Sequence, residues 1–184
     1  MDKKSFRKKC LKRLKATSKN RSYINDKLVN FKIDKVIQKH KPKSILFYLP
    51  LSLEVDTKSL IDNYRKKLKV FTPFIVGESF KMVQYRQPLR CNSFNIYEPS
   101  NSKIEFKRVD MIIVPVVGVD GDFKRVGFGR GMYDRFYEKL KNRPIVVFVQ
   151  RIKCHTKKRI TDDYDVRCDY YITPKEFIKL RKTR

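Results

Sequence analysis

Acidic residues are scarce in this sequence: its 184 residues include 19 Asp and Glu against 45 Lys and Arg, which gives a formal net charge of +26 at pH 7. Glycine and proline are scarce as well, with 6 and 8 residues, while hydrophobic residues make up 41%. This composition excludes collagen-like and disordered chains, which carry far more glycine and proline or far less apolar material. We expect one domain over residues 1–184, because two domains would each have too small an interior.

Long hydrophobic runs are absent. The longest apolar segments, 111–119 and 145–149, are much shorter than the roughly 20 residues that a membrane-spanning helix needs. The beginning of the chain is too rich in lysine and arginine to contain the apolar part of a secretory signal. We therefore expect no membrane partner and a cytoplasmic location.

Closely spaced cysteines are missing too. Cys10, Cys91, Cys154 and Cys168 include no Cys-x-x-Cys pair, so the sequence indicates no disulfide framework and agrees with a reducing compartment. A zinc site made of Cys154, His155 and Cys168 would lack both the paired spacing and the fourth ligand that structural zinc usually has. The spacing therefore disfavours a metal–thiolate centre.

The expected secondary structure begins with two helices, of which the first is basic and amphipathic. One covers residues 3–19, and the other runs from Tyr23 to about Lys39. Lys3 and Arg7 are one turn apart and project together from the start of the first helix, where they could grip an anion or simply face solvent. Apolar residues at helical spacing predict the face that each helix buries: Phe6, Cys10 and Leu14 in the first, and Ile24, Leu28, Phe31 and Val36 in the second.

Strands and helices alternate in the rest of the chain. Short apolar or β-branched segments predict strands, and helical spacing of apolar residues predicts helices between them. The expected strands are 44–49, 70–72, 80–85, 110–118, 145–149 and 170–173. The expected helices include Leu60–Leu68 and Tyr133–Leu140, and a last basic helix begins at Pro174. This order favours a three-layer α/β/α domain with a mostly parallel central sheet and helices on both faces.

A glycine-rich segment between a strand and a helix carries the clearest chemical signal. It is Arg125-Val-Gly-Phe-Gly-Arg-Gly-Met-Tyr-Asp-Arg-Phe136. Its alternating glycines let successive backbone N–H groups converge on phosphate oxygens beside Arg125 and Arg130. Asp134, at the start of the helix, can hold the magnesium of a nucleoside triphosphate. The segment matches neither the Walker nor the dinucleotide pattern, and an ordinary glycine-rich turn stays open as the plain alternative.

This segment resembles the signature of the 5-formyltetrahydrofolate cyclo-ligase family. Val114-Pro-Val-Val-Gly-Val-Asp120 and the run from Arg125 to Phe136 are similar to the family pattern V-P-G-x-A-F-D…R-L-G-Y-G-x-G-Y-Y-D-R-F. Further similar pieces follow in the family's order: Lys3-x-x-x-Arg7, 49–57, 96–99 and 163–173. The ordered set covers nearly the whole chain and is much more specific than any single piece.

The chain departs from the family pattern at three positions. Val116 replaces a usual glycine and Met132 a usual tyrosine, and both look like changes in packing. Tyr164 replaces a histidine that commonly precedes the aspartate, which is retained as Asp165. This last departure concerns the corner that handles metal or nucleotide in the family.

The resemblance implies an ATP- and magnesium-dependent cyclisation of 5-formyltetrahydrofolate to 5,10-methenyltetrahydrofolate. ADP and phosphate would leave through a phosphorylated formyl (iminophosphate) intermediate. We expect a monomer that acts on the folate with or without a polyglutamate tail. The resemblance assigns ATP to Lys3, Arg7, Arg125, Gly127, Phe128, Gly129, Arg130, Gly131, Met132 and Tyr133, and the folate to Leu49, Glu54 and Tyr133. It assigns magnesium to Asp134 and Asp165, and catalysis to Arg125, Arg130 and Tyr133.

Plainer roles and rival functions stay open. Glu54 could be a helix-start acid and Tyr133 a core aromatic. The positive charge suits a nucleic-acid-binding protein, although Lys and Arg are spread along the chain and no known nucleic-acid-binding motif is present, so we expect no specific nucleic-acid partner. The charge can instead steer anionic substrates. An inactive relative that only binds folate would share every binding residue.

Overall fold

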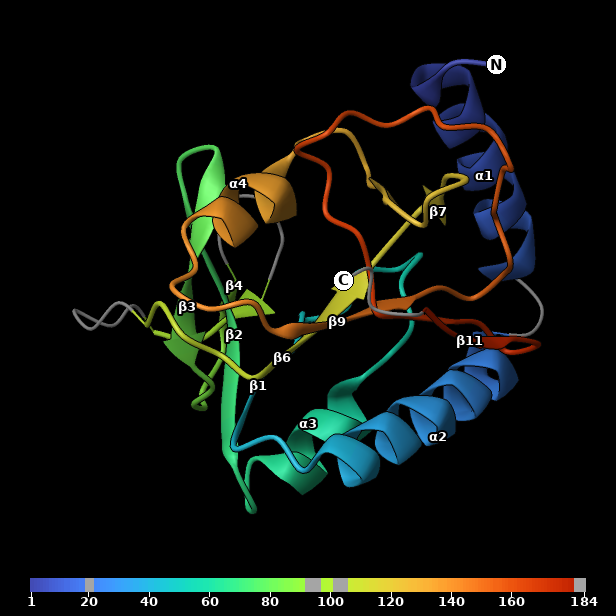
Figure 1. The fold of residues 1–184 in the computed structure, drawn as a ribbon. Coiled ribbons are helices and arrows are strands. Elements are labelled where there is room, and N and C mark those ends of the chain that lie inside the picture. Colours follow the sequence, from blue (N-terminus) through green and yellow to red (C-terminus); the bar gives the residue numbers. More distant parts are fainter. Residues whose placement is uncertain (19–21, 92–96, 101–105, 181–184) are drawn as a thin grey trace.

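A central sheet with helices on both faces forms the fold (Figure 1). The structure is a computed structural model that describes residues 1–18, 22–91, 97–100 and 106–180. The helices are α1 (Lys3–Ser18), α2 (Ser22–His40), α3 (Lys58–Tyr64) and α4 (Met132–Glu138). The strands of the main sheet are β1 (Ser44–Leu46), β2 (Lys69–Val76), β3 (Ser79–Gln84), β6 (Met111–Pro115), β9 (Ile145–Val149), β10 (Tyr170–Ile172) and β11 (Phe177–Lys179).

The main sheet has seven strands in the order β11-β10-β9-β6-β1-β2-β3. Its inner neighbours are all parallel, and only the edge strands β3 and β11 run antiparallel. Two small hairpin-like pairs lie outside this sheet: β4 (Arg90–Cys91) with β5 (Tyr97–Glu98), and β7 (Gly118–Val119) with β8 (Arg125–Val126). The predicted α/β class with a mostly parallel sheet is confirmed. Ligands of such sheets bind beyond the carboxyl ends of the strands.

The core is divided between the two faces of the sheet, because successive strand residues point to opposite sides. Ile45 and Ile113 belong to a cluster that packs against α2 and α3, whereas Leu46 and Ile112 belong to a cluster that includes Phe136 of α4. In Figure 1, α2 and α3 lie on one side of the sheet and α4 on the other. A smaller third cluster lies under α1: Phe6, Cys10, Leu14, Val117, Val126 and Cys154.

The two N-terminal helices differ in how well their buried faces were predicted. Phe6, Cys10 and Leu14 of α1 are buried as expected. In α2 the prediction is wrong for three of four residues, because Ile24, Leu28 and Phe31 are 61%, 44% and 59% exposed. The helix instead buries the opposite stripe, which consists of Asp26, Val29, Ile33, Val36 and Ile37.

The physical reason is that α2 carries apolar residues on both of its faces. Apart from Asp26, the stripe that lies on the sheet consists of compact β-branched residues, which pack closely against a pleated surface. The exposed stripe is covered in part by lysine side chains, with the Lys35 ammonium 4.5 Å from the centre of the Phe31 ring and Lys27 equally close to Tyr23. Within the described residues, no helix is long and apolar enough to cross a membrane.

Two other expectations are wrong, one about where a strand ends and one about the type of an element. The expected strand 70–72 continues through Pro73 to Val76 in β2. Proline is tolerated there because β2 pairs with β1 only through Lys69–Phe71, so the missing N–H of Pro73 leaves no bond to β1 unmade. The expected helix after Pro174 is instead strand β11, which pairs with β10 after a turn. Lys32 of α2 holds that turn by donating to the carbonyl oxygens of Thr173 and Pro174.

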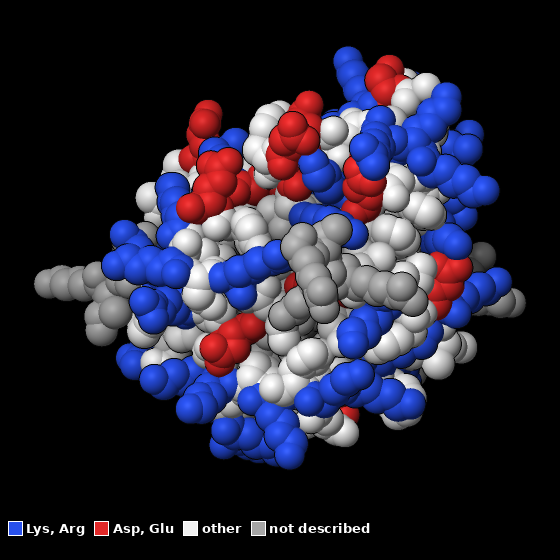
Figure 2. All heavy atoms as spheres, viewed as in Figure 1, with Lys and Arg blue, Asp and Glu red and all other residues white. Residues whose placement is uncertain are grey.

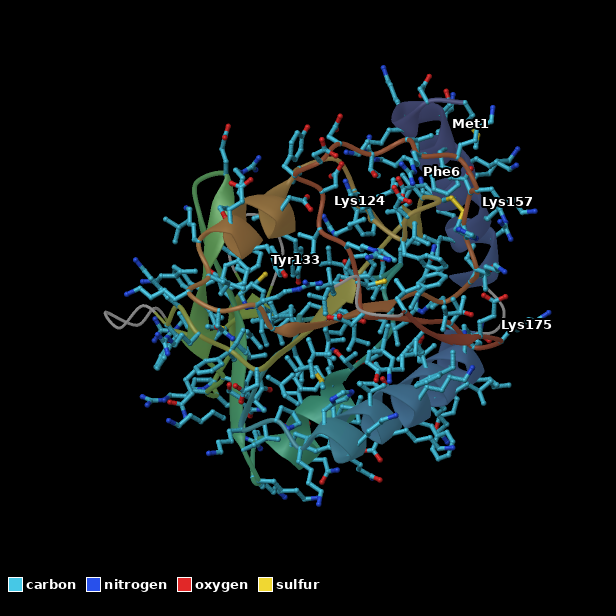
Figure 3. The ribbon with its side chains drawn as sticks, viewed as in Figure 1. Met1, Phe6, Lys124, Tyr133, Lys157 and Lys175 are labelled. Carbon is cyan, nitrogen blue, oxygen red and sulfur yellow. A yellow bond between two sulfur atoms is a disulfide. The ribbon has the colours of Figure 1, made fainter. Side chains whose placement is uncertain are left out.

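A disulfide joins Cys10 of α1 to Cys154, which follows β9 (the yellow bond beside α1 in Figure 3). The expectation that the cysteines are unpaired is therefore wrong for this pair. The two residues are 144 positions apart, and only packing of α1 on the sheet brings them together. Cys154 is thus no thiolate ligand, and the described residues contain no group of three His, Cys, Asp or Glu side chains that could hold a metal ion.

Candidate functional site

Two adjoining cavities contain the expected site residues. The apolar pocket, of about 360 Å³, is lined by residues that include Tyr48, Leu49, Glu54, Phe80, Pro115 and Tyr133. The basic hollow, of about 250 Å³, is lined by residues that include Lys3, Arg7, Gly127, Gly129, Asp134 and Asp165. Arg125, Arg130 and Gly131 line both cavities, which therefore meet at two guanidinium groups.

The start of α1 closes one side of the basic hollow. The Asp2 carboxylate caps this helix by accepting the backbone N–H of Ser5 at 2.7 Å. One turn apart, the Lys3 ammonium contacts Asp165 and the Arg7 Nε donates to the carbonyl oxygen of Gly127 at 2.8 Å. The expected pair of cations thus lies directly beside the glycine-rich segment.

The glycine-rich segment forms the floor of the hollow between β8 and α4. Gly129 and Gly131 have φ values of 108° and 60°. These positive values suit glycine, which lacks a Cβ, far better than other residues. Since Gly129 is followed by the exposed Arg130, the segment presents backbone and a cation to the same space. Such an arrangement can bind the oxygens of a phosphate group.

Arg125 occupies the boundary between the cavities. Its side chain is buried, and its Nη1 pairs with the Asp134 carboxylate at 3.3 Å. Its guanidinium carbon lies 4.9 Å from the centre of the Tyr133 ring. Its Nε is buried without a hydrogen-bond partner among the described residues. Because buried donors are normally paired, this atom is a spare donor for a bound anion.

Three acids line the basic hollow: Asp134 and Asp165 are buried, whereas Glu138 is exposed. Asp134 accepts a hydrogen bond from the backbone N–H of Val166 at 3.3 Å, and Asp165 accepts one from Asp162 at 2.8 Å. Magnesium beside a triphosphate commonly uses only one or two protein carboxylates, with phosphates and water as the other ligands. Two buried carboxylates in one hollow fit that requirement. Tyr164, which replaces the family's histidine, is exposed, and its hydroxyl donates to Asp162.

Glu54 is the acid of the apolar pocket. Its Oε2 accepts the backbone N–H of Leu51 at 2.9 Å. Burial raises the pKa of Glu54 to about 7, although this bond and the nearby cations Arg125 and Arg151 oppose the rise. The carboxyl therefore changes charge near neutral pH, which is unusual for a glutamate and common in binding or catalytic sites.

Tyr133 projects from α4 into the same pocket (Figure 3). Burial, helped by the negative charge of Glu54, raises the pKa of its hydroxyl well above the ordinary value, so the side chain is a neutral phenol. Its ring also packs edge-on against Phe80 at 4.9 Å between centres. Tyr133 therefore packs as a core aromatic would and also has access to the cavity.

All the site residues that we expected line one of the two cavities, but not always the expected one. Phe128, Met132 and Tyr133, which were expected at ATP, line the apolar pocket and not the basic hollow. The sequence analysis missed other lining residues: Tyr48, Leu51, Pro73, Ile75, Phe80, Tyr97 and Pro115. Pro115 lies within the matched pattern and could have been found, whereas Pro73 and Ile75 were hidden because β2 was expected to end before them.

Lys and Arg are spread over the face shown in Figure 2, with other residues between them, and are not gathered in one groove or stripe. Acidic side chains come together in the upper part of this face. A nucleic-acid-binding surface usually shows a continuous basic patch. The distribution of charge on this face therefore gives the nucleic-acid-binding alternative no specific surface.

Comparison with known proteins identifies the family of this chain. The chain matches the model of the 5-formyltetrahydrofolate cyclo-ligase family over residues 1–174. A 5-formyltetrahydrofolate cyclo-ligase of Haemophilus influenzae is 26% identical, over 71% of this chain and 75% of the relative. The NMR structure of Aquifex aeolicus 5,10-methenyltetrahydrofolate synthetase has a TM-score of 0.82 at 28% identity and covers 100% of this chain and 95% of its own.

A second structure supports the fold alone. It is a 5,10-methenyltetrahydrofolate synthetase from Mycoplasma pneumoniae, 22% identical, with a TM-score of 0.74 over 95% of this chain and 100% of that one. The family resemblance, the ligase class and the α/β fold expected from the sequence are confirmed. None of these relatives supports the nucleic-acid-binding alternative.

Proposed function

We propose that the protein, which belongs to the 5-formyltetrahydrofolate cyclo-ligase family, uses ATP and magnesium to cyclise 5-formyltetrahydrofolate to 5,10-methenyltetrahydrofolate. The observation that carries this proposal is the junction of an apolar pocket and a basic hollow at Arg125, Arg130 and Gly131. A reduced pterin in the pocket and a triphosphate in the hollow would meet at the two guanidinium groups. Phosphoryl transfer between bound partners depends mainly on such positioning and on neutralisation of charge.

The proposed reaction has two steps. The formyl oxygen of the folate attacks the γ-phosphorus of ATP, ADP leaves, and an iminophosphate forms. N10 of the folate then attacks the formyl carbon and loses its proton, and phosphate departs with the oxygen. An amide-like oxygen leaves readily only after phosphorylation, so the reaction needs no nucleophilic side chain.

In the basic hollow, Lys3, Arg7, Arg125 and Arg130 would neutralise the triphosphate together with the backbone of the glycine-rich segment. The buried Nε of Arg125 supports this role, because it is a donor without a partner among the described residues. Asp134 and Asp165 would hold magnesium, which would supply further neutralisation of the phosphates when bound. Lys3 and Arg125 contact these same acids, so the proposed phosphate-binding cations and the proposed magnesium-binding acids lie side by side.

In the apolar pocket, Glu54 would accept hydrogen bonds from the N–H edge of the pterin, as a carboxylate does best. Tyr133 and Leu49 line the pocket beside it and would hold the ring in position. Because the pKa of Glu54 is about 7, binding through the ionised carboxyl should weaken as the pH falls below that value.

The direct test is to follow the absorbance of the methenyl product formed from 5-formyltetrahydrofolate, with and without ATP and magnesium. Asp134→Asn should lower turnover by about a hundredfold or more while the protein stays folded, because the magnesium that would neutralise the phosphates loses a carboxylate ligand. Asp163→Asn is the matched control, since Asp163 is a fully exposed neighbour of the proposed metal corner. It should keep wild-type turnover.

Normal magnesium-dependent turnover in Asp134→Asn would contradict the metal assignment. Folate binding without any turnover in the wild type would show an inactive relative and exclude the ligase activity. Steeply salt-dependent binding to a generic RNA duplex, with no turnover, would favour the nucleic-acid-binding alternative.

A further inference from the structure

The loop that carries Glu54 is held from behind by an ion pair that lies outside both cavities. Arg151, which follows β9, donates through Nε and Nη2 to the two carboxylate oxygens of Asp26 in α2, both at 2.8 Å. Its Nη1 donates to the carbonyl oxygen of Ser52 at 2.6 Å. Both side chains are buried. Within the described residues, neither lines the apolar pocket or the basic hollow.

The Ser52 contact matters because the shape of this loop directs Glu54. The backbone N–H of Glu54 donates to the Leu51 carbonyl at 2.9 Å, and the Leu51 N–H donates to the Glu54 carboxylate. Ser52 lies inside the tight turn that these bonds close. A shift of Ser52 would therefore turn the Glu54 side chain relative to the pocket.

Neutral contacts hold the far end of the same loop. Asn30 of α2 donates to the Asp56 carbonyl at 2.7 Å, and the Tyr48 hydroxyl donates to the Val55 carbonyl at 2.7 Å. Among the described side chains, Arg151 is the charged group that fastens the turn itself. Hydrogen bonds to charged groups are worth roughly twice those between neutral groups.

Arg151 also acts on Glu54 through its charge. The charged groups that face this carboxyl are Arg125 and Arg151, which both lower its pKa, and its titratable neighbours Tyr48 and Tyr133 are neutral phenols. Loss of the Arg151 cation should therefore raise the pKa of Glu54 further above its ordinary value. The ionised carboxyl would then require a higher pH.

We propose that Arg151, oriented by Asp26, is a positioning residue for the folate: it fixes the Ser52 carbonyl and thereby the direction of Glu54, without touching the substrate. The identity of the ligand rests on the proposed function. If the ion pair served stability alone, its loss would lower the fraction of folded protein and nothing else. A positioning residue must change folate affinity selectively.

Arg151→Met is the main test variant. Its KM and directly measured Kd for 5-formyltetrahydrofolate should rise about tenfold or more, the effect of one charge-assisted contact, while the KM for ATP changes less than about twofold. The acid limb of the pH profile of folate binding should move to higher pH. Arg151→Lys should restore that limb, because the charge is kept, but only part of the affinity, because the planar fork is lost.

A double variant distinguishes the loss of positioning from a loss of folding. Arg151→Met alone leaves Asp26 buried without its partner, whereas Asp26→Leu combined with Arg151→Met replaces the pair by apolar groups that are often tolerated. If this folded double variant binds folate as the wild type does, the proposal is wrong. Lys153→Met is the matched control, because Lys153 forms an exposed ion pair with Glu176 in the same segment. It should change neither KM.

Hydrogen exchange separates this inference from the proposed function, because it needs no substrate. In ligand-free Arg151→Met, the backbone amides of residues 51–57 should exchange about tenfold faster or more, since local opening becomes easier. Unchanged exchange in that loop would overturn the positioning role whatever the protein binds. Absence of the methenyl product with the wild type would instead overturn the proposed function and leave the result for the loop intact.

Discussion

The two N-terminal helices differ in charge, since α1 is strongly basic whereas α2 carries aspartates beside its lysines, and they serve the site in different ways. α1 places Lys3 and Arg7 in the basic hollow, so it supplies groups that can touch a ligand. α2 supplies no lining residue to either cavity among the described residues. It holds the loop of Glu54 through Asn30 and through the contact of Asp26 with Arg151. A helix can thus act on a site either by lining it or by holding in place a loop that lines it.

Both helices are fastened to the same short segment after β9. Arg151 pairs with α2, and Cys154 forms the disulfide with α1. The segment is itself held from within the sheet, because the Tyr171 hydroxyl donates to Gln150 at 2.7 Å and accepts the Cys154 N–H at 3.1 Å. The two sides of the site therefore share an anchor. Because each helix serves a different cavity, we expect changes in α1 to affect mainly ATP and changes in α2 to affect mainly the folate.

The largest expected difference lies between the two faces of α2. Ile33→Ala should lower the free energy of unfolding by about 2–5 kcal/mol, because a fully buried side chain is lost, whereas Phe31→Ala should cost less than about 0.5 kcal/mol. Urea unfolding of both variants measures this. Equal losses would mean that the exposed stripe is also packed and that α2 has no free face.

A slightly smaller effect is expected from the bond that anchors α1. Cys10→Ser should lower the free energy of unfolding by about 2–4 kcal/mol, because the disulfide no longer restrains the unfolded chain. The KM for ATP should rise while that for the folate stays the same, since α1 carries cations only to the basic hollow. Thermal unfolding and steady-state kinetics measure both quantities, with Cys91→Ser as the control because Cys91 is exposed and lies outside the Cys10–Cys154 disulfide. A rise in the folate KM alone would contradict the division of roles.

The smallest of these effects should follow from removing the two cations of α1. Lys3→Met combined with Arg7→Met should raise the KM for ATP about tenfold to a hundredfold, or roughly 1.4–2.7 kcal/mol, because contacts to charged phosphate oxygens are lost. The KM for the folate should change less than about twofold. Lys4→Met with Lys8→Met, on the exposed side of the helix, is the charge-matched control. The reverse order of the two KM changes would show that α1 serves the folate.

The same two helices show how far the sequence could lead. The apolar residues of α1 form one stripe surrounded by lysines, so its buried face was predictable. In α2, Ile24, Leu28 and Phe31 share helical spacing with one another, and so do Val29, Ile33 and Val36. Spacing cannot choose between two stripes, because either would form a good apolar face. The β-branched stripe is the one that lies on the sheet.

The glycine-rich segment was predictable because its chemistry is local. Glycines, arginines and an acid within ten positions fold into the wall of one hollow. The side-chain directions of Phe128 and Met132 were not predictable, since they depend on where β2 and the Glu54 loop lie.

The sequence alone determined most of the alternation of strands and helices, the inner face of α1 and the glycine-rich segment between β8 and α4, because each depends on residues close together in the chain. Only the tertiary structure decided which face of α2 is buried, that Cys154 meets Cys10, and that Arg151 meets Asp26. The last two pairs are 144 and 125 positions apart. Their contacts form when the sheet buries the helices, and no local pattern specifies which distant residue will fill a given place.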